Sequence, residues 1–154
     1  MSADPRVDRT VTLAVDYHSQ GFNCAEAVLK ALVEEFKLPG GNVPSVATGF
    51  GGGVGRSGGI CGALTGAVMA LGIKLCRKYA EESHLKSQAN DGALKLVRGF
   101  EQQMGSTLCR DITGYVLCIP EQMERWKQER ISETRCRKAI EVAVTLASGL
   151  LSQT

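Results

Sequence analysis

Apolar residues recur every three or four positions along much of the chain, the spacing at which side chains share one face of an α-helix. The first such stretch follows Asp4-Pro5, a capping residue with proline at the first helical position, and it ends at Gly21. The second follows Asn23, another capping residue, and it closes at the turn of residues 38–42. We therefore predict that the chain opens with two amphipathic helices.

A third apolar stretch, Ile60 to Leu75, follows a glycine-dense segment, residues 49–59. Its large apolar residues recur at helical spacing, so we predict a buried central helix that begins near Gly59 or Ile60. This start places Cys61 in the first turn. The stretch is too short to span a membrane, and it carries Lys74, so we expect no membrane insertion.

The second half of the chain predicts two further long helices around a charged segment. One helix begins near Glu81 and ends at Gly105, with Leu94, Val97 and Phe100 facing inward. The last helix follows Ser132 as its cap. The sequence shows no convincing strand pair, internal repeat or long linker. We therefore predict one all-α domain over residues 1–154. It has about five helices and a glycine-rich loop that leads into a central buried helix.

Composition narrows the class of protein. The 154 residues suffice for one domain with a real core, and the formal net charge of +2 is small and evenly spread. We therefore expect no nucleic-acid partner. The polar start carries no export signal, which favours a cytoplasmic location, where thiols are kept reduced. Small residues such as Gly62, Gly66 and Gly72 permit close helix approach, and a homodimer interface is one use for them.

The six cysteines are the main candidates for chemistry. None of them forms a C-x-x-C pair, so neither a thioredoxin-type dithiol nor zinc-finger knuckles are indicated locally. Cys24 and Cys61 both fall at predicted helix starts, where the helix dipole and free N–H groups favour the thiolate over the thiol. Arg56 adds positive charge near Cys61. We therefore predict Cys61 as the reactive thiolate.

The glycine loop suggests a phosphate site, but its context argues against a nucleotide. Residues 53–58 match G-x-G-x-x-G, yet no strand precedes them and residues 73–76 lack the expected ribose-binding acid. A P-loop fails as well, because Phe50 replaces its first glycine and Arg56 its lysine. A bound anion at the helix start stays open. The candidate residues for binding it, or another cofactor, are Gly52, Gly53, Gly55, Arg56, Gly58 and Gly59.

The motifs together resemble a known family. Gly21-Phe22-Asn23-Cys24, the glycines of residues 49–53, the segment Cys61 to Gly66, Cys109-Arg110 and Cys136 look like the C-GCAxxG-C-C family of redox-active proteins. The resemblance runs from about Asp16 to Leu150, and the motifs agree in order and approximate spacing. The family's name writes glycine before cysteine, whereas Cys61 precedes Gly62 here.

The resemblance implies that four cysteines act together, and it implies a redox partner protein or a small oxidant or reductant. Carried over residue by residue, the four are Cys24, Cys61, Cys109 and Cys136. Cys76 and Cys118 fall outside the pattern. The family implies no particular substrate.

Three functions remain open for the four cysteines. In the first, Cys61 reacts and Cys24 or Cys109 resolves the product as a disulfide. In the second, all four ligate an iron–sulfur cluster whose sulfurs accept hydrogen bonds from the loop amides. In the third, they hold structural zinc, which the lack of close cysteine pairs disfavours. His18, shortly before Cys24, is a candidate for proton transfer or metal binding, although a buried histidine or cysteine can also be purely structural.

Overall fold

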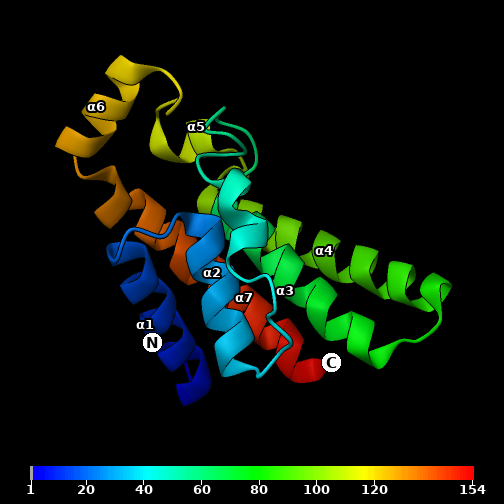
Figure 1. The fold of residues 1–154 in the computed structure, drawn as a ribbon. Coiled ribbons are helices and arrows are strands. Elements are labelled where there is room, and N and C mark those ends of the chain that lie inside the picture. Colours follow the sequence, from blue (N-terminus) through cyan, green and yellow to red (C-terminus); the bar gives the residue numbers. More distant parts are fainter. Residues whose placement is uncertain (1) are drawn as a thin grey trace.

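The five long helices that the apolar pattern predicts are all present in the computed structural model, which describes residues 2–154 (Figure 1). They are α1 (Pro5–Ser19), α2 (Cys24–Glu35), α3 (Gly62–Lys78), α4 (Glu82–Met104) and α7 (Arg135–Gln153). Two short α-helices, α5 (Cys109–Thr113) and α6 (Pro120–Gln128), and two 3-10 helices, η1 (Ser45–Phe50) and η2 (Ile131–Glu133), complete the fold. The all-α prediction is confirmed, and the expected count of about five helices was low.

The predicted caps form by direct contacts. The Asp4 side chain accepts a hydrogen bond from the Arg6 amide at 2.9 Å, and the Asn23 side chain accepts one from the Glu26 amide at 3.0 Å. Gly105 ends α4 with a φ of +82°, a conformation that glycine adopts without steric cost. The cap predicted for the last helix is wrong, because Ser132 lies within η2 and α7 starts after Thr134.

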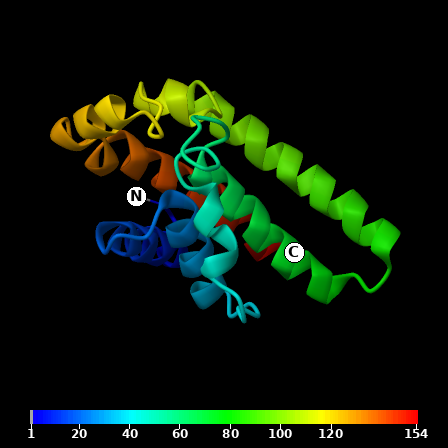
Figure 2. The same ribbon diagram turned by 45° about the horizontal axis from the view of Figure 1, so that its top comes forward.

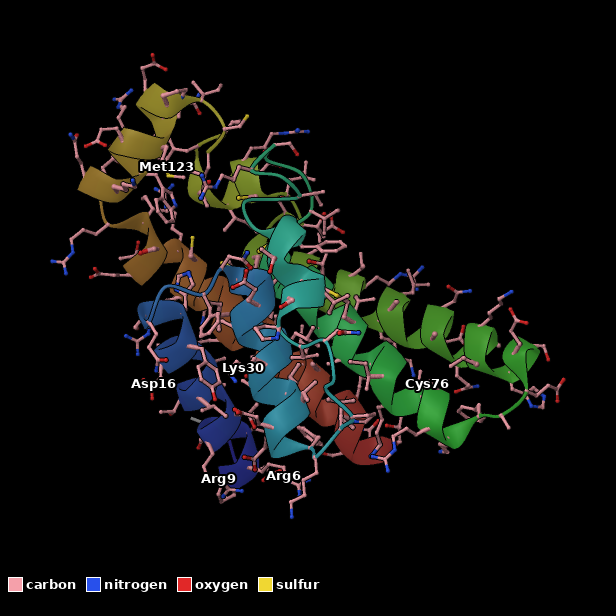
Figure 3. The ribbon with its side chains drawn as sticks, in the orientation of Figure 1. Arg6, Arg9, Asp16, Lys30, Cys76 and Met123 are labelled. Carbon is pink, nitrogen blue, oxygen red and sulfur yellow. The ribbon has the colours of Figure 1, made fainter. Side chains whose placement is uncertain are left out.

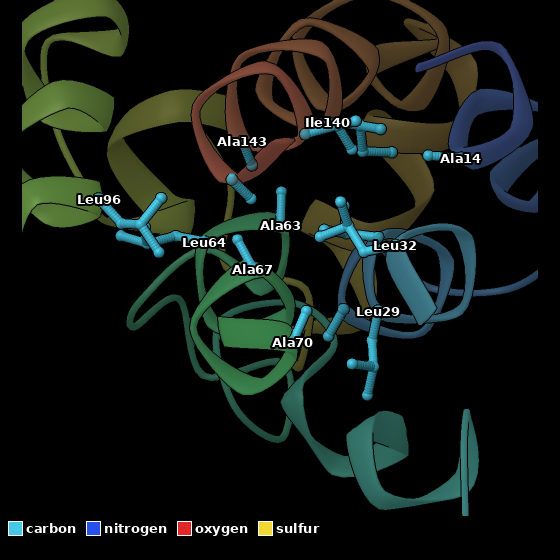
Figure 4. Packing of buried hydrophobic residues seen from close by; sticks show 14 of the residues in the cluster. Ala14, Leu29, Leu32, Ala63, Leu64, Ala67, Ala70, Leu96, Ile140 and Ala143 are labelled. Atoms are coloured by element: carbon cyan, nitrogen blue, oxygen red, sulfur yellow. The ribbon is translucent and has the colours of Figure 1, made fainter. Parts of the chain in front are cut away.

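The core forms around α3, as predicted for the central helix. Figures 1 and 2 show α3 between α2 and α4, with α7 crossing behind it. Ala63, Ala67 and Ala70 of α3 are fully buried, and in the close view of Figure 4 they lie between Leu29 of α2 and Ala143 of α7. Small side chains on α3 let its neighbours approach closely, so the core is compact despite few aromatic residues.

The closest approach in the core lies between α2 and α3. A Cβ added at Gly66 would lie 2.7 Å from the Ala25 carbonyl oxygen, and one at Gly62 would lie 3.0 Å from the Ala25 amide nitrogen. No side chain fits between the two backbones there. The glycines of the C-GCAxxG-C-C motif therefore allow the start of α2 to lie directly against the start of α3.

Helix α4 buries most of the face that the pattern predicts. Phe100 is fully buried and Val97 packs against the core, whereas Leu94 is 46% exposed. The inward prediction for Leu94 was wrong because α4 packs on the rest of the molecule along one narrow side. Among the residues that the structure describes, no helix combines the length and the apolar character that crossing a membrane needs.

We expect Gly66→Ala to lower the free energy of unfolding by about 1–3 kcal/mol, because the new methyl group overpacks the contact between α2 and α3. Gly72→Ala is the matched control within α3. A Cβ at Gly72 meets nothing within 4 Å, so this change should be neutral or stabilise by up to about 1 kcal/mol. Urea denaturation measures both. Equal effects of the two substitutions would contradict the close-contact explanation.

Candidate functional site

One pocket, of about 680 Å³, opens at the end of the molecule where the glycine loop, α5 and α6 gather beside the start of α2. Three of the four cysteines singled out by the family resemblance line it: Cys24, Cys109 and Cys136. Its other walls come from His18, the loop residues Gly52, Gly55 and Arg56, and Met123 and Trp126 of α6. Figure 3 places Met123 on α6 above this end of the bundle, with Cys76 far away along α3.

The four cysteines share a structural position, since each lies at the N-terminal end of a helix. Cys24 is the first residue of α2, Cys109 the first of α5 and Cys136 the second of α7, while Cys61 caps α3. Negative charge on Cys136, Cys61 or Cys109 raises the pKa of Cys24, so the four sulfurs act on one another electrostatically. Three of the four cysteines that the resemblance implied thus line one pocket, and Cys61 lies outside its lining as the cap of α3.

Among the four cysteines, Cys24 and Cys136 affect each other's pKa most strongly. Hydrogen bonding between the two thiol side chains is the main cause that raises the pKa of Cys24 well above its usual value and lowers the pKa of Cys136. Cys136 also lies in the first turn of α7, where the helix dipole favours a thiolate. The pair is therefore electrostatically unequal: when it loses one proton, the negative charge is favoured on Cys136 and the remaining proton on Cys24.

The prediction that Cys61 is the reactive thiolate stays a prediction, and the surroundings of Cys61 do not favour it. Cys61 is 5% exposed, and burial raises its pKa to about 12, although the amides of Ala63 and Leu64 act in the opposite direction. Burial likewise raises the pKa of Cys109 to about 11. The helix-start argument named the right kind of position but omitted the cost of desolvating a thiolate, and here that cost is the larger effect.

Two other side chains contact the thiol pair. The Nε2 atom of His18 lies 3.7 Å from the Cys24 sulfur, and burial lowers the pKa of His18, so the neutral imidazole is favoured. The indole N–H of Trp126 is buried and has no hydrogen-bond partner among residues 2–154, and its proximity to Cys136 contributes to lowering the pKa of Cys136. Sequence reasoning kept His18 as a candidate but assigned no role to Trp126, whose helical spacing alone does not reveal its neighbour.

Several amides of the glycine loop are engaged in hydrogen bonds within the loop itself. The amides of Gly55, Gly58 and Gly59 donate to the carbonyls of Gly49, Gly52 and Gly53 at 2.8–3.0 Å, and the Arg56 amide donates to Gly51 at 3.0 Å. Of the six residues predicted to bind an anion or cofactor, Gly52, Gly55 and Arg56 line the pocket, whereas Gly53, Gly58 and Gly59 do not.

The loop instead positions two of the cysteines. The carbonyl of Gly59 accepts a hydrogen bond from the Cys109 amide at 2.7 Å, and the Cys61 amide donates to the Thr107 carbonyl at 2.8 Å. These bonds join the residues before α3 to those before α5. A Cβ at Gly53 would lie 2.5 Å from the Gly59 backbone, so the loop can close in this form only with glycine there.

The cysteines are not arranged as the iron–sulfur and zinc interpretations require. Within residues 2–154, no three or more histidine, cysteine, aspartate or glutamate side chains are arranged to hold a metal ion. Cys76 and Cys118, which fall outside the family pattern, are exposed. Neither of them lines the pocket.

Comparison with protein families gives one match. The model of a family described as "Putative redox-active protein (C_GCAxxG_C_C)" matches residues 22–150, a range that includes all four cysteines of the site. No curated protein and no solved structure matches the chain.

We expect Trp126→Phe to raise the pKa of Cys136, because the substitution removes an N–H donor to the sulfur and keeps an aromatic ring. Alkylation of Cys136 by iodoacetamide at pH 7, mapped by mass spectrometry, should slow about fivefold, the equivalent of a hydrogen bond of ~1 kcal/mol. Met123→Leu, on the same helix and the same pocket wall, is the control and should leave the rate unchanged. Faster alkylation of Cys61 than of Cys136 in the unchanged protein would contradict the assignment.

Proposed function

The chain belongs to the C-GCAxxG-C-C family of redox-active proteins, and on this basis we propose that it is a thiol–disulfide oxidoreductase whose Cys24 and Cys136 alternate between dithiol and disulfide. The observation that carries the proposal is that Cys24 and Cys136 line the same open pocket and shift each other's pKa in opposite directions. A disulfide needs two cysteines whose sulfurs can meet, and this pair comes from two helix starts that already face each other.

The reaction has two steps that balance without a bound cofactor. The Cys136 thiolate attacks one sulfur of a substrate disulfide, the substrate S–S bond breaks, and one substrate thiolate leaves. Cys24 then loses its proton and attacks the Cys136 sulfur of the mixed disulfide, which releases the second substrate thiolate. Two electrons pass from the protein to the substrate, and the protein keeps a disulfide that a redox partner must reduce.

The electrostatics of the pair favour this order. The thiol with the lowered pKa, Cys136, is the better nucleophile at neutral pH, whereas Cys24 is held protonated chiefly by its hydrogen bond to Cys136. When Cys136 enters a mixed disulfide, its negative charge disappears. The main cause of the raised pKa of Cys24 disappears with it, so formation of the first bond prepares the second thiol to react.

His18 is suited to accept the proton that Cys24 loses. Its Nε2 atom lies 3.7 Å from the sulfur, and its lowered pKa keeps the imidazole neutral, which is the form that accepts a proton. Its titratable neighbours in the pocket are Cys24, Cys109 and Cys136, and the ionised side chains there are Glu26, Arg56 and Lys127. None of these three charged side chains forms an ion pair with His18.

Cys61 and Cys109 are supporting thiols in this proposal. Both have raised pKa values, and both are more than nine-tenths buried, so at neutral pH they are protonated and weakly nucleophilic. The iron–sulfur and zinc interpretations have less support, because the described side chains include no set arranged around a metal ion. Stoichiometric iron and sulfide in protein purified without oxygen would favour the cluster over the disulfide.

We expect the reduced protein, treated with a small disulfide, to lose two thiols per chain and form a Cys24–Cys136 disulfide. Peptide mapping without reduction identifies the link. Cys24→Ser should accumulate the mixed disulfide on Cys136, whereas Cys136→Ser lacks the attacking thiolate and should form no disulfide within the pocket. Cys76→Ser and Cys118→Ser, at two exposed cysteines outside the pocket, are the matched controls and should form the link normally. A link that contains Cys61, or its absence in the unchanged protein, would refute the proposal.

We also expect His18→Gln to slow release of the second substrate thiol about a hundredfold at pH 7, because the general base is lost. In the unchanged protein this step should accelerate as the pH rises through the lowered pKa of His18, since only the deprotonated ring accepts a proton. The variant should lack that inflection and keep only the rise due to Cys24 itself. His84→Gln, at the exposed histidine paired with Glu81, is the control. An unchanged pH profile in His18→Gln would exclude the assigned role.

A further inference from the structure

Two cationic side chains stand at the pocket without partners. Arg56 and Lys127 both line the pocket and are exposed to solvent, and neither forms an ion pair within the described part of the chain. Glu26 is the carboxylate among the lining residues, and its Oε1 accepts a hydrogen bond from the Asn23 amide group at 3.0 Å. The charges available to a ligand in the pocket are therefore predominantly positive.

The backbone of Arg56 is held firmly. Its φ of +61° is unusual for a residue other than glycine. Its amide donates to the Gly51 carbonyl at 3.0 Å, and its carbonyl accepts from the Cys118 amide at 2.9 Å. The loop therefore presents this guanidinium from a fixed base, and guanidinium groups bind carboxylates with two parallel hydrogen bonds.

The size and depth of the pocket suit a small substrate. The sulfurs lie below the surface, since Cys136 is 6% exposed and Cys109 7%, with Met123 and Trp126 on the wall beside them. A volume of about 680 Å³ falls within the range of roughly 300–1,000 Å³ that is usual for small-molecule sites. A disulfide on the surface of a folded protein would have to insert its sulfurs past these walls.

We propose, building on the thiol–disulfide function above, that the substrate is a low-molecular-weight disulfide with carboxylate groups, and that Arg56 and Lys127 determine this specificity. The carboxylates pair with the two cations while the substrate sulfurs lie at Cys136. The Cys136 thiolate displaces one carboxylated thiolate, and Cys24 displaces the other as its proton passes to His18. The two electrons that reduce the substrate come from the Cys24–Cys136 pair.

Three disulfides of similar size and different charge test this specificity: dithiodipropionate (dianionic), hydroxyethyl disulfide (neutral) and cystamine (dicationic). Each is mixed in excess with reduced protein, and fluorescence of Trp126, the single tryptophan in the sequence, follows formation of the Cys24–Cys136 disulfide. The second-order rate constants should fall in the order dianion, neutral, dication. The differences should shrink as salt screens the cations.

Variants with a neutral side chain at Arg56 or Lys127 test whether these two residues cause the order of the rate constants. Arg56→Gln and Lys127→Gln should each lower the rate constant for dithiodipropionate about fivefold and leave that for hydroxyethyl disulfide unchanged. Lys95→Gln, at an exposed lysine of α4 that does not line the pocket, makes the same change in net charge and should have no effect.

Results with the neutral disulfide distinguish a failure of the proposed specificity from a failure of the thiol–disulfide function on which it rests. Equal rate constants for the three small disulfides would overturn the specificity and leave the thiol–disulfide function intact. The same conclusion would follow if Arg56→Gln and Lys127→Gln lowered the rate constant for hydroxyethyl disulfide as much as that for dithiodipropionate. Faster reduction of a disulfide in a folded protein, such as insulin, would also overturn it by favouring a protein substrate. Failure of all disulfides to oxidise the Cys24–Cys136 pair would overturn both proposals.

Discussion

The backbone contact between α2 and α3 links the core of this protein to its site. At Gly62 and Gly66 the two helices approach so closely that the Ala25 backbone leaves no space for a Cβ atom. Ala25 follows Cys24 directly, and Gly62 follows Cys61. The packing that buries the alanines of α3 therefore also determines where two of the four cysteines lie, so core stability and site geometry depend on the same few atoms.

Burial and hydrogen bonding have opposite effects on the thiols of the site, and their balance differs from one cysteine to the next. Burial alone favours the neutral thiol, which describes Cys61 and Cys109. At Cys136 the hydrogen bond from Cys24, aided by the indole N–H of Trp126, outweighs burial. Cys24 is affected in the opposite sense, because it supplies the proton of that bond. Four cysteines at similar helix positions thus acquire different chemistry from their neighbours.

Local patterns in the sequence predicted the helices and most of their ends, because caps at Asp4 and Asn23 and the turn at Gly105 act within a few residues. The inward position of Leu94 and the start of α7 were predicted wrongly, since both depend on contacts with distant segments. The same limit applies to the site. Helix-start positions singled out Cys24 and Cys61, and the family resemblance added Cys109 and Cys136. The pairing of Cys24 with Cys136 and the approach of Trp126 arise only when α2, α6 and α7 pack together.

The hydrogen bonds of the glycine loop have a consequence for its length. Three of them, from Gly55 to Gly49, Gly58 to Gly52 and Gly59 to Gly53, each connect residues six positions apart, so they form a regular ladder along the segment. One residue inserted or deleted between Gly53 and Gly55 would move the donor and the acceptor of each of these three hydrogen bonds out of register. Because Cys61 and Cys109 are tied to the end of this ladder, both would move together. The number of residues between Gly49 and Cys61 therefore cannot change without moving the site, whereas an exposed residue of the loop such as Val54 can be replaced by another residue type.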